Sequence, residues 1–252
     1  MWLLDLGNTR LKLSRAGAAG LGPVLALPHA GPELEKHLRT ALASDSAPVW
    51  WSSVAADALS ARVAGVLAEH GRRVERVETR REALGLRIAY ADPARLGVDR
   101  FLALLAARGE GGAHLLVSFG SAITVDLLDA GGQHRGGMIG IAPGHARQAL
   151  AQRFPALDRG EADWGQGYAI DTPEALAAGV EAQALGLVVS AWHEALALLP
   201  EPPQVGLAGG DARRLQPRLD ALLGVPTKLA EHRVLEGLRR IANAAGAIVP
   251  HC

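Results

Sequence analysis

The chain has 252 residues, 49% hydrophobic and 21% charged, a composition typical of folded globular proteins that argues against disorder. Its 26 Lys and Arg residues balance 26 Asp and Glu residues, so the net charge is zero. This balance removes the main electrostatic argument for nucleic acid or an anionic membrane as a partner. The length allows one large domain or two lobes.

Several features predict a cytoplasmic protein. The only cysteine is Cys252, so no disulfide forms within the chain, which fits a reducing compartment. The N-terminus does not have the pattern of a signal peptide, because Asp5 interrupts its apolar run. The longest apolar segment, 184–199, contains His193 and Glu194 and therefore predicts a buried helix rather than a membrane span.

Strands and helices alternate along the chain, which predicts an α/β fold. Short alternating or apolar runs predict strands, and spacings of three and four predict helices. Strands are expected at 3–6, 10–14, 47–54, 72–78, within 114–140 (three strands joined by glycine turns) and at the start of 204–215. Helices are expected at 32–42, from a capping Asp57 to His70, at 96–108, 143–153, from Asp171 or Thr172 to 199, at the end of 204–215 and at 231–248.

A weak similarity between two segments of the chain suggests two lobes. "LLDLGNTRLKL" begins the chain, and "LLVSFGSAITVDL" follows a glycine-rich linker near 110–113. Aligning Gly7 with Gly120 sets Asp5 opposite Ser118. Two lobes that each begin with a strand–turn–strand hairpin would bring the two turns face to face across a cleft. We therefore expect lobes at 1–111 and 112–252.

The turn "DLGNT" (residues 5–9) has two readings. A glycine turn exposes backbone N–H groups to which a phosphate can bind, and an Asp at a strand end supplies the oxygen ligand that Mg²⁺ prefers. Arg10 and Lys12 would add positive charge. The alternative is an ordinary hairpin turn in which Asp5 bonds locally. A short motif alone leaves both readings open.

A second polar motif, "LGVDR" (residues 96–100), opens an apolar helix. Asp99 is able to accept a proton from a substrate hydroxyl in phosphoryl transfer, as the catalytic Asp of kinases does. The alternative is that Asp99 caps the helix and Arg100 is solvated. The chain contains neither the P-loop pattern nor GxGxxG. His114, His134 and His145 have no metal-ligand spacing and are expected to be surface or structural residues.

Taken in order, seven motifs resemble the type III pantothenate kinase family over almost the full chain: "DLGNTRLK", "YADPARLGVDR", "FGSAITVD", "GGMIGIAPG", "DTPEALAAG", "LAGGDA" and "HRVLEGL". The resemblance implies two ribonuclease H-like lobes of the actin/hexokinase/Hsp70-like superfamily, with ATP bound in the cleft between them. It implies ATP-dependent phosphorylation of pantothenate to 4′-phosphopantothenate, the first committed step towards coenzyme A. Pantothenate and ATP would be the partners of a homodimer, and neither nucleic acid nor a membrane is expected.

The resemblance also implies residue roles. The ATP phosphates would be held by Asp5, Leu6, Gly7, Asn8, Thr9, Arg10, Leu11 and Lys12, with Asp5 organising Mg²⁺ and Ser121 contacting the nucleotide. Pantothenate would be bound by Tyr90, Gly97, Val98, Asp99, Arg100 and Thr172. Asp99 would be the catalytic general base on the primary hydroxyl.

One position departs from the family pattern. The second hairpin of the family usually has an Asp that helps bind a monovalent cation, K⁺ or ammonium, where this chain has Ser118. A serine hydroxyl can coordinate K⁺ but brings no charge, which puts the dependence on a monovalent cation in question. Two alternatives stay open: a non-catalytic regulatory relative, since some family members were first described as accessory factors for gene expression, and a related small-metabolite kinase of the same superfamily.

Overall fold

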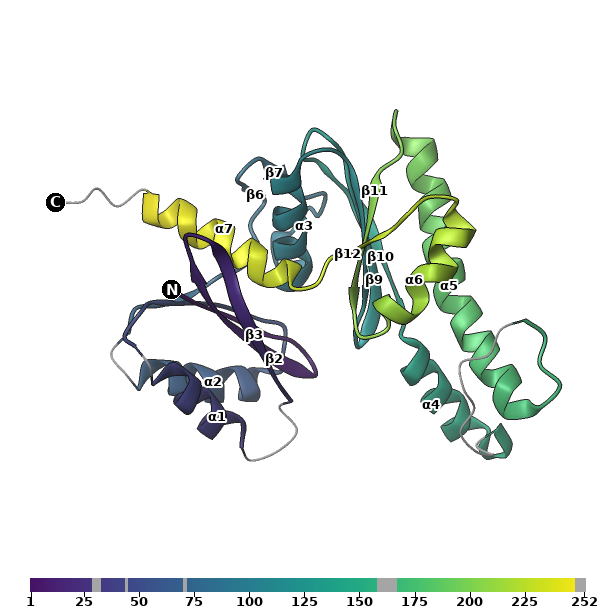
Figure 1. The fold of residues 1–252 in the computed structure, drawn as a ribbon, viewed down its shortest axis with the longest axis horizontal. Coiled ribbons are helices and arrows are strands. Elements are labelled where there is room, and N and C mark those ends of the chain that lie inside the picture. The colour runs from purple at the N-terminus through teal and green to yellow at the C-terminus, as the bar shows by residue number, and fades with distance from the viewer. Residues whose placement is uncertain (29–32, 44, 70–71, 158–166, 248–252) are drawn as a thin grey trace. The chain divides into compact units, whose positions relative to one another are not determined.

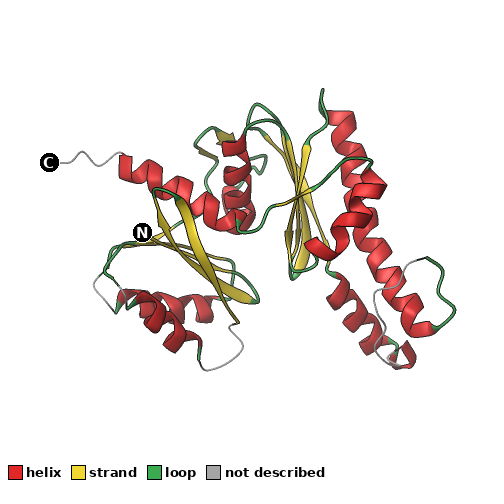
Figure 2. Cartoon of the chain, in the orientation of Figure 1, coloured by secondary structure: helices red, strands yellow, loops and turns green. Residues whose placement is uncertain are grey.

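The computed structural model describes residues 1–28, 33–43, 45–69, 72–157 and 167–247. They divide into two compact units, each built on a five-stranded mixed sheet (Figures 1 and 2). The first unit comprises residues 1–111, 132–134 and the chain from 232 onward. The second comprises 112–131 and 135–231. The expected α/β class is confirmed.

The first sheet has the strand order β3-β2-β1-β4-β5. Its strands are β1 (Trp2–Leu6), β2 (Arg10–Gly17), β3 (Gly20–Pro28), β4 (Val49–Ser53) and β5 (Val74–Arg76). β1 pairs with β2 antiparallel and with β4 parallel. Because side chains alternate along a strand, Leu4 and Leu6 enter a core with helices α1 (Leu34–Leu42) and α2 (Asp57–Ala68). Asp5 therefore projects from the opposite face of the sheet.

That opposite face of the first sheet meets helices α3 (Val98–Glu110) and α7 (Arg233–Ala247). The two helices contact each other, and a Cβ added at Gly237 of α7 would lie 2.1 Å from the carbonyl oxygen of Leu102. No side chain fits that contact, so glycine is needed for the helices to approach. A small two-stranded sheet, β6 (Glu82–Ala83) and β7 (Leu86–Arg87), and the 3₁₀ turn η1 (Pro93–Arg95) precede α3.

The second sheet repeats the arrangement of the first, with the order β10-β9-β8-β11-β12. Its strands are β8 (His114–Phe119), β9 (Ala122–Leu128), β10 (His134–Ile141), β11 (Gln204–Gly209) and β12 (Lys228–Leu229). Helices α4 (Pro143–Arg153), α5 (Thr172–Leu198) and α6 (Ala212–Leu223) and the turn η2 (Pro155–Leu157) complete the unit. Val117 and Phe119 pack in one core with Val188 and Trp192 of α5 and Leu215 of α6.

The similarity between the segments around Gly7 and Gly120 corresponds to this repeated topology. Asp5 pairs across the hairpin with Lys12 and beside the parallel strand with Ser52, and Ser118 pairs in the same way with Thr124 and Ala208. The two turns differ in length, because Leu6 pairs with Leu11 whereas Phe119 pairs with Ile123. The second hairpin is one residue shorter, a difference that the alignment of the glycines did not reveal.

The position of the last helix differs from the sequence expectation. The lobe expected at 112–252 included this helix, whereas α7 groups with the first unit. The physical reason is its packing on α3, reinforced by an ion pair at 2.8 Å between Arg233 and Glu110. Residues 132–134 also group with the first unit.

Most predicted elements are present, with small shifts at their ends. Asp57 does not cap α2, because the N-cap is Ala56 and no side chain bonds there. Asp171 does cap α5, accepting from the Thr172 N–H at 2.7 Å. The sequence predictions missed β3, β6, β7 and β12. The predicted ends at Pro32, His70 and 248, and Cys252, lie outside the described residues.

Helix α5 is long and apolar enough to cross a membrane by length and composition alone. Its most apolar window has a mean hydropathy of 1.4, and 44% of that window is buried inside the structure. The buried side packs against the second sheet through Val188, Trp192 and Ala195. The core helix of a globular protein has the same character, and this packing supports the predicted buried helix.

Candidate active site

The turn between β1 and β2 places several polar residues at one end of the first sheet. The Gly7 N–H donates to the Arg10 carbonyl at 3.1 Å, and a Cβ at residue 7 would lie 3.3 Å from that oxygen. Asn8, Thr9 and Arg10 are exposed. Leu6 and Leu11 are wholly buried in the core, so their side chains are not available to a phosphate.

Asp5 is a buried acid whose pKa is strongly raised. Its side chain is 7% exposed, and burial raises its pKa to about 7. The positive charge of Lys12 opposes this shift, and the negative charge of Asp99 adds to it. The neighbouring Ser52 hydroxyl lowers the pKa least and does not reach hydrogen-bond geometry. Asp5 thus lies close enough to Asp99 for the two carboxyl groups to repel each other.

Asp99 is held at the first turn of α3. Its Oδ1 accepts from the Arg100 N–H at 2.8 Å, one of the unsatisfied donors at a helix N-terminus. The N-cap is Gly97, where an added Cβ would lie 2.6 Å from Asp99 Oδ1 and 3.8 Å from Val54 Cγ1. Glycine at residue 97 therefore leaves the room that the carboxylate occupies.

Arg100 points its guanidinium at Tyr90. The arginine is buried, its Nη1 donates to the Tyr90 hydroxyl at 3.3 Å, and its Cζ lies 5.9 Å from the centre of the tyrosine ring. Arg100 is therefore not the solvated residue of the alternative reading. Val98 is also buried. The first unit thus brings together Asp5, Lys12, Tyr90 and residues 97–100.

The residues around Asp5 fit a divalent cation. Ser52 Oγ is buried and has no hydrogen-bond partner among the described residues. Sequence reasoning missed Ser52, whose only signal was its place near the end of a strand parallel to β1. Within the described ranges no three His, Cys, Asp or Glu side chains gather as a metal-binding group. Mg²⁺ typically takes only one or two carboxylates from a protein and its other ligands from water and phosphate. The repulsion between Asp5 and Asp99 is what such a cation would relieve.

The remaining predicted residues belong to the second unit. Ser118 lies near the end of β8, and Gly120 in the turn donates its N–H to the Ala122 carbonyl at 3.0 Å. The Ser121 carbonyl accepts from His145 Nδ1 at 2.7 Å, a contact that the sequence did not indicate. Thr172 is exposed at the first turn of α5. His114 and His134 are buried, which fits the structural role of the expected alternatives and not a surface position.

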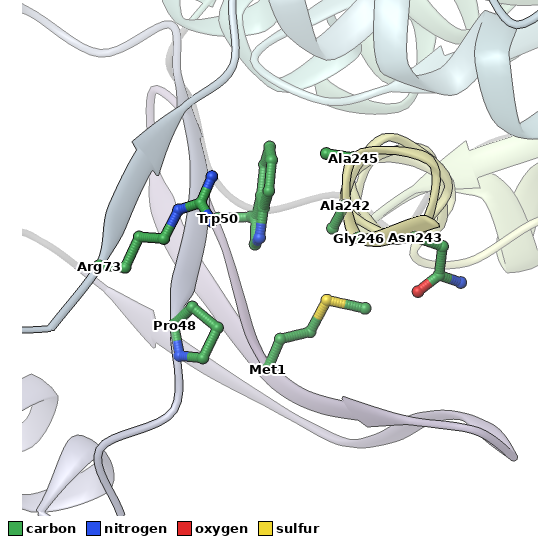
Figure 3. A pocket seen from close by; sticks show the side chains of 8 residues that line it. All are labelled: Met1, Pro48, Trp50, Arg73, Ala242, Asn243, Ala245 and Gly246. Atoms are coloured by element: carbon green, nitrogen blue, oxygen red, sulfur yellow. The ribbon is translucent and has the colours of Figure 1, made fainter. Parts of the chain in front are cut away.

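A pocket of about 450 Å³ lies elsewhere in the first unit (Figure 3). In Figure 3 the indole of Trp50 rises from the sheet toward Ala242 and Ala245 of α7. The pocket lies where β1 and β4 begin, whereas Asp5 and Ser52 lie near the ends of those strands. It is therefore separate from the carboxylate pair. Its lining residues are Met1, Pro48, Trp50, Arg73, Ala242, Asn243, Ala245 and Gly246.

Comparison with known proteins gives a consistent family match. Residues 1–194 match the family described as type III pantothenate kinase. A relative named type III pantothenate kinase, from Xanthomonas oryzae pv. oryzae, is 39% identical over 246 residues, which cover 98% of each chain. The matched residues 1–194 include the predicted site residues of both units.

Solved structures with low sequence identity share the fold. A candidate Baf family transcriptional activator from Campylobacter jejuni has a TM-score of 0.64 at 17% identity, covering 98% of this chain and 100% of its own. MreB 5 of Spiroplasma citri, bound to AMPPNP, has a TM-score of 0.50 at 13% identity, covering 98% of this chain and 96% of its own. With the repeated sheet order, these likenesses confirm the expected actin/hexokinase/Hsp70-like fold.

Proposed function

This chain belongs to the type III pantothenate kinase family, and we propose on that premise that it transfers the γ-phosphoryl group of ATP to pantothenate. The product is 4′-phosphopantothenate, for coenzyme A biosynthesis. The observation that carries the proposed site is the buried Asp5 beside Asp99, at the turn that ends β1. A structural hairpin alone gives no reason to bury one carboxyl group near another, because burial and like charge both disfavour it.

Asp99 is the proposed general base. It accepts the proton of the primary hydroxyl of pantothenate while that oxygen attacks the γ-phosphorus, and ADP leaves with the electrons of the broken P–O bond. The hydrogen bond from the Arg100 N–H fixes Oδ1, so that the carboxylate keeps one orientation. The other assigned residues of this segment, Tyr90, Gly97, Val98 and Arg100, bind or shape the site for pantothenate, and Thr172 contributes from α5.

The hairpin residues 5–12 are proposed to hold the phosphates of ATP, with Ser121 on the nucleotide. The exposed residues Asn8, Thr9 and Arg10 offer their side chains, and the buried Leu6 and Leu11 fix the two strands that carry the turn. Asp5 would hold Mg²⁺, and Ser52 Oγ, which has no hydrogen-bond partner in the described part of the chain, lies beside it. When bound, this cation neutralises charge on the phosphates during transfer. Lys12 adds positive charge next to Asp5.

Two further properties belong to the proposal. We propose a cytoplasmic homodimer, supported by apolar side chains that remain exposed on the edge strand β10, at Ile139 and Ile141, and near the end of α5, at Leu198. Light scattering coupled to gel filtration measures the mass in solution, and a monomer of 26.3 kDa at assay concentration would contradict the dimer.

The test of function measures ADP release with pantothenate in the presence of K⁺, ammonium or neither. We expect pantothenate-dependent release, and we expect the rate to vary little among the three conditions, because Ser118 brings no charge to the cation position. Ser118→Asp is the matched variant and should make the rate depend on K⁺ or ammonium. Absence of pantothenate-dependent release under all three conditions would contradict the kinase and favour the regulatory alternative.

A further inference from the structure

A short segment of the β9–β10 connection is anchored in the first unit. The Arg87 N–H donates to the Gly132 carbonyl at 2.9 Å, and Gln133 Nε2 donates to the Arg87 carbonyl at 3.2 Å. Gly132 has a φ of +90°, and a Cβ there would lie 2.1 Å from the Gly85 carbonyl oxygen. Only glycine meets both demands, so residues 132–134 are locked against β7.

This anchored segment ends in a buried histidine that lies flat against Tyr90. His134 is 0% exposed, and its ring is stacked on the Tyr90 ring with centroids 6.0 Å apart and planes 8° apart. The Ala89 N–H donates to His134 Nδ1 at 3.5 Å, a weak bond at the limit of hydrogen-bond distance. The ring stack and this bond both join His134 to the segment that carries Tyr90.

Tyr90 in turn contacts Arg100. The hydroxyl accepts from Arg100 Nη1, and the guanidinium lies over the same ring that His134 stacks on. A tyrosine fixed by these contacts has few orientations left, and an arginine that bonds to its hydroxyl is fixed with it. A continuous chain of contacts thus joins His134, Tyr90 and Arg100.

We infer that His134 is a positioning residue for pantothenate: its ring holds Tyr90, and through Tyr90 it holds Arg100, in the orientation that binds the substrate. The inference rests on the proposed function, which assigns Tyr90 and Arg100 to pantothenate. His134 itself acts through its neighbour. Its influence should therefore fall on binding of pantothenate, and neither on binding of ATP nor on the transfer step.

Three variants distinguish the contribution of the His134 ring from that of its Nδ1 atom. His134→Ala removes both, His134→Asn keeps an acceptor near Nδ1, and His134→Phe keeps the ring. Because aromatic stacking contributes modestly, Ala and Asn should raise the KM for pantothenate about threefold to tenfold. The KM for ATP and kcat should stay within about twofold. Phe should restore the KM, since it keeps the ring that stacks on Tyr90. If the Ala variant does not fold, the comparison of Asn with Phe still shows whether the ring is needed for a normal KM for pantothenate.

A spectroscopic measurement tests the stack without any substrate. The chain has only two tyrosines, Tyr90 and Tyr168, so ring-labelled tyrosine gives two sets of NMR signals that Tyr168→Phe assigns. We expect the Tyr90 signals to move in the Ala and Asn variants and to change less in the Phe variant. Unmoved Tyr90 signals, an unchanged KM for pantothenate in the Ala and Asn variants, or a Phe variant as impaired as Asn would overturn the inference. A wild-type protein that does not phosphorylate pantothenate would instead contradict the proposed function.

Discussion

At the scale of single residues, Asp5 illustrates how a site can be poised for a cation. A carboxyl group that is 7% exposed and faces another acid prefers to hold its proton, and its pKa rises to about 7. Burial beside another acid destabilises the ionised carboxylate of Asp5. A divalent cation bound next to it would offset this, because its positive charge replaces the water that the carboxylate has lost. The ionised carboxylate that the proposed cation site needs is therefore the form that lowers the stability of the metal-free protein.

The charge state of Asp5 gives a prediction for the metal-free protein. Its pKa is about 7 in the folded state and 3.8 for an unperturbed Asp, so between these values the folded state holds a proton that the unfolded state has lost. The stabilisation from that proton is complete below the lower value and is lost as the pH rises through the higher one. Asp5→Asn does not titrate. We therefore expect it to exceed the wild type in stability by up to about 4 kcal/mol near pH 8.

Urea unfolding in the presence of a chelator measures this difference from about pH 5 to about pH 8. Asp57→Asn, at an exposed position, controls for the substitution itself. A stability difference between Asp5→Asn and the wild type that stays constant with pH would contradict the account. The same variant should lose Mg²⁺-dependent turnover.

At the scale of elements, the start of α3 brings Asp99, the proposed catalytic base, close to Asp5 on the sheet. The helix begins after Gly97, whose φ of −53° is accessible to any residue. Glycine is required here by the space that Asp99 occupies, and not by backbone conformation. This distinction separates an effect on catalysis from an effect on folding.

Gly97→Ala should therefore impair turnover and spare the fold. The new methyl group would displace Asp99 Oδ1 from its place 2.6 Å away, and a base moved by about 1 Å costs on the order of 10²-fold in rate. We expect kcat to fall 10-fold to 100-fold, with the free energy of unfolding within about 1 kcal/mol of the wild type. Gly65→Ala, in an open position on α2, is the matched control and should keep full activity. Unchanged kcat in Gly97→Ala would refute the role of residue 97.

The predictability of these elements followed the strength of their local signals. Helix α3 has an apolar face, α4 begins at Pro143, and α5 is a long apolar run capped by Asp171, so the sequence located all three well. Strands β3 and β12 were missed, because β3 is a largely exposed edge strand without alternation and β12 has only two residues. The shorter second hairpin was not predictable, since a one-residue difference in a turn changes register without changing the motif.

At the scale of the whole molecule, two units repeat the same strand order. The similarity between the segments around Gly7 and Gly120 predicted two lobes that each begin with a hairpin, and it did not predict the order of the other strands. The motifs also indicated the main candidate residues of the first unit. Sequence alone did not indicate Ser52 or His134, because each joins the site through tertiary contacts: Ser52 beside β1, and His134 through the anchored β9–β10 segment. Nor did it assign α7 to the first unit, because helix packing on α3 leaves no local pattern.

The most direct test of the central claim compares product formation by the wild type and Asp99→Asn. Asn keeps the oxygen that accepts from the Arg100 N–H, so the local fold should survive while the base is lost. With ATP, Mg²⁺ and pantothenate, phosphorus NMR should show 4′-phosphopantothenate from the wild type, and a rate about 10²-fold to 10⁴-fold lower from Asp99→Asn with ATP binding retained. Equal rates from the two proteins, or no phosphorylated pantothenate from the wild type, would contradict the account.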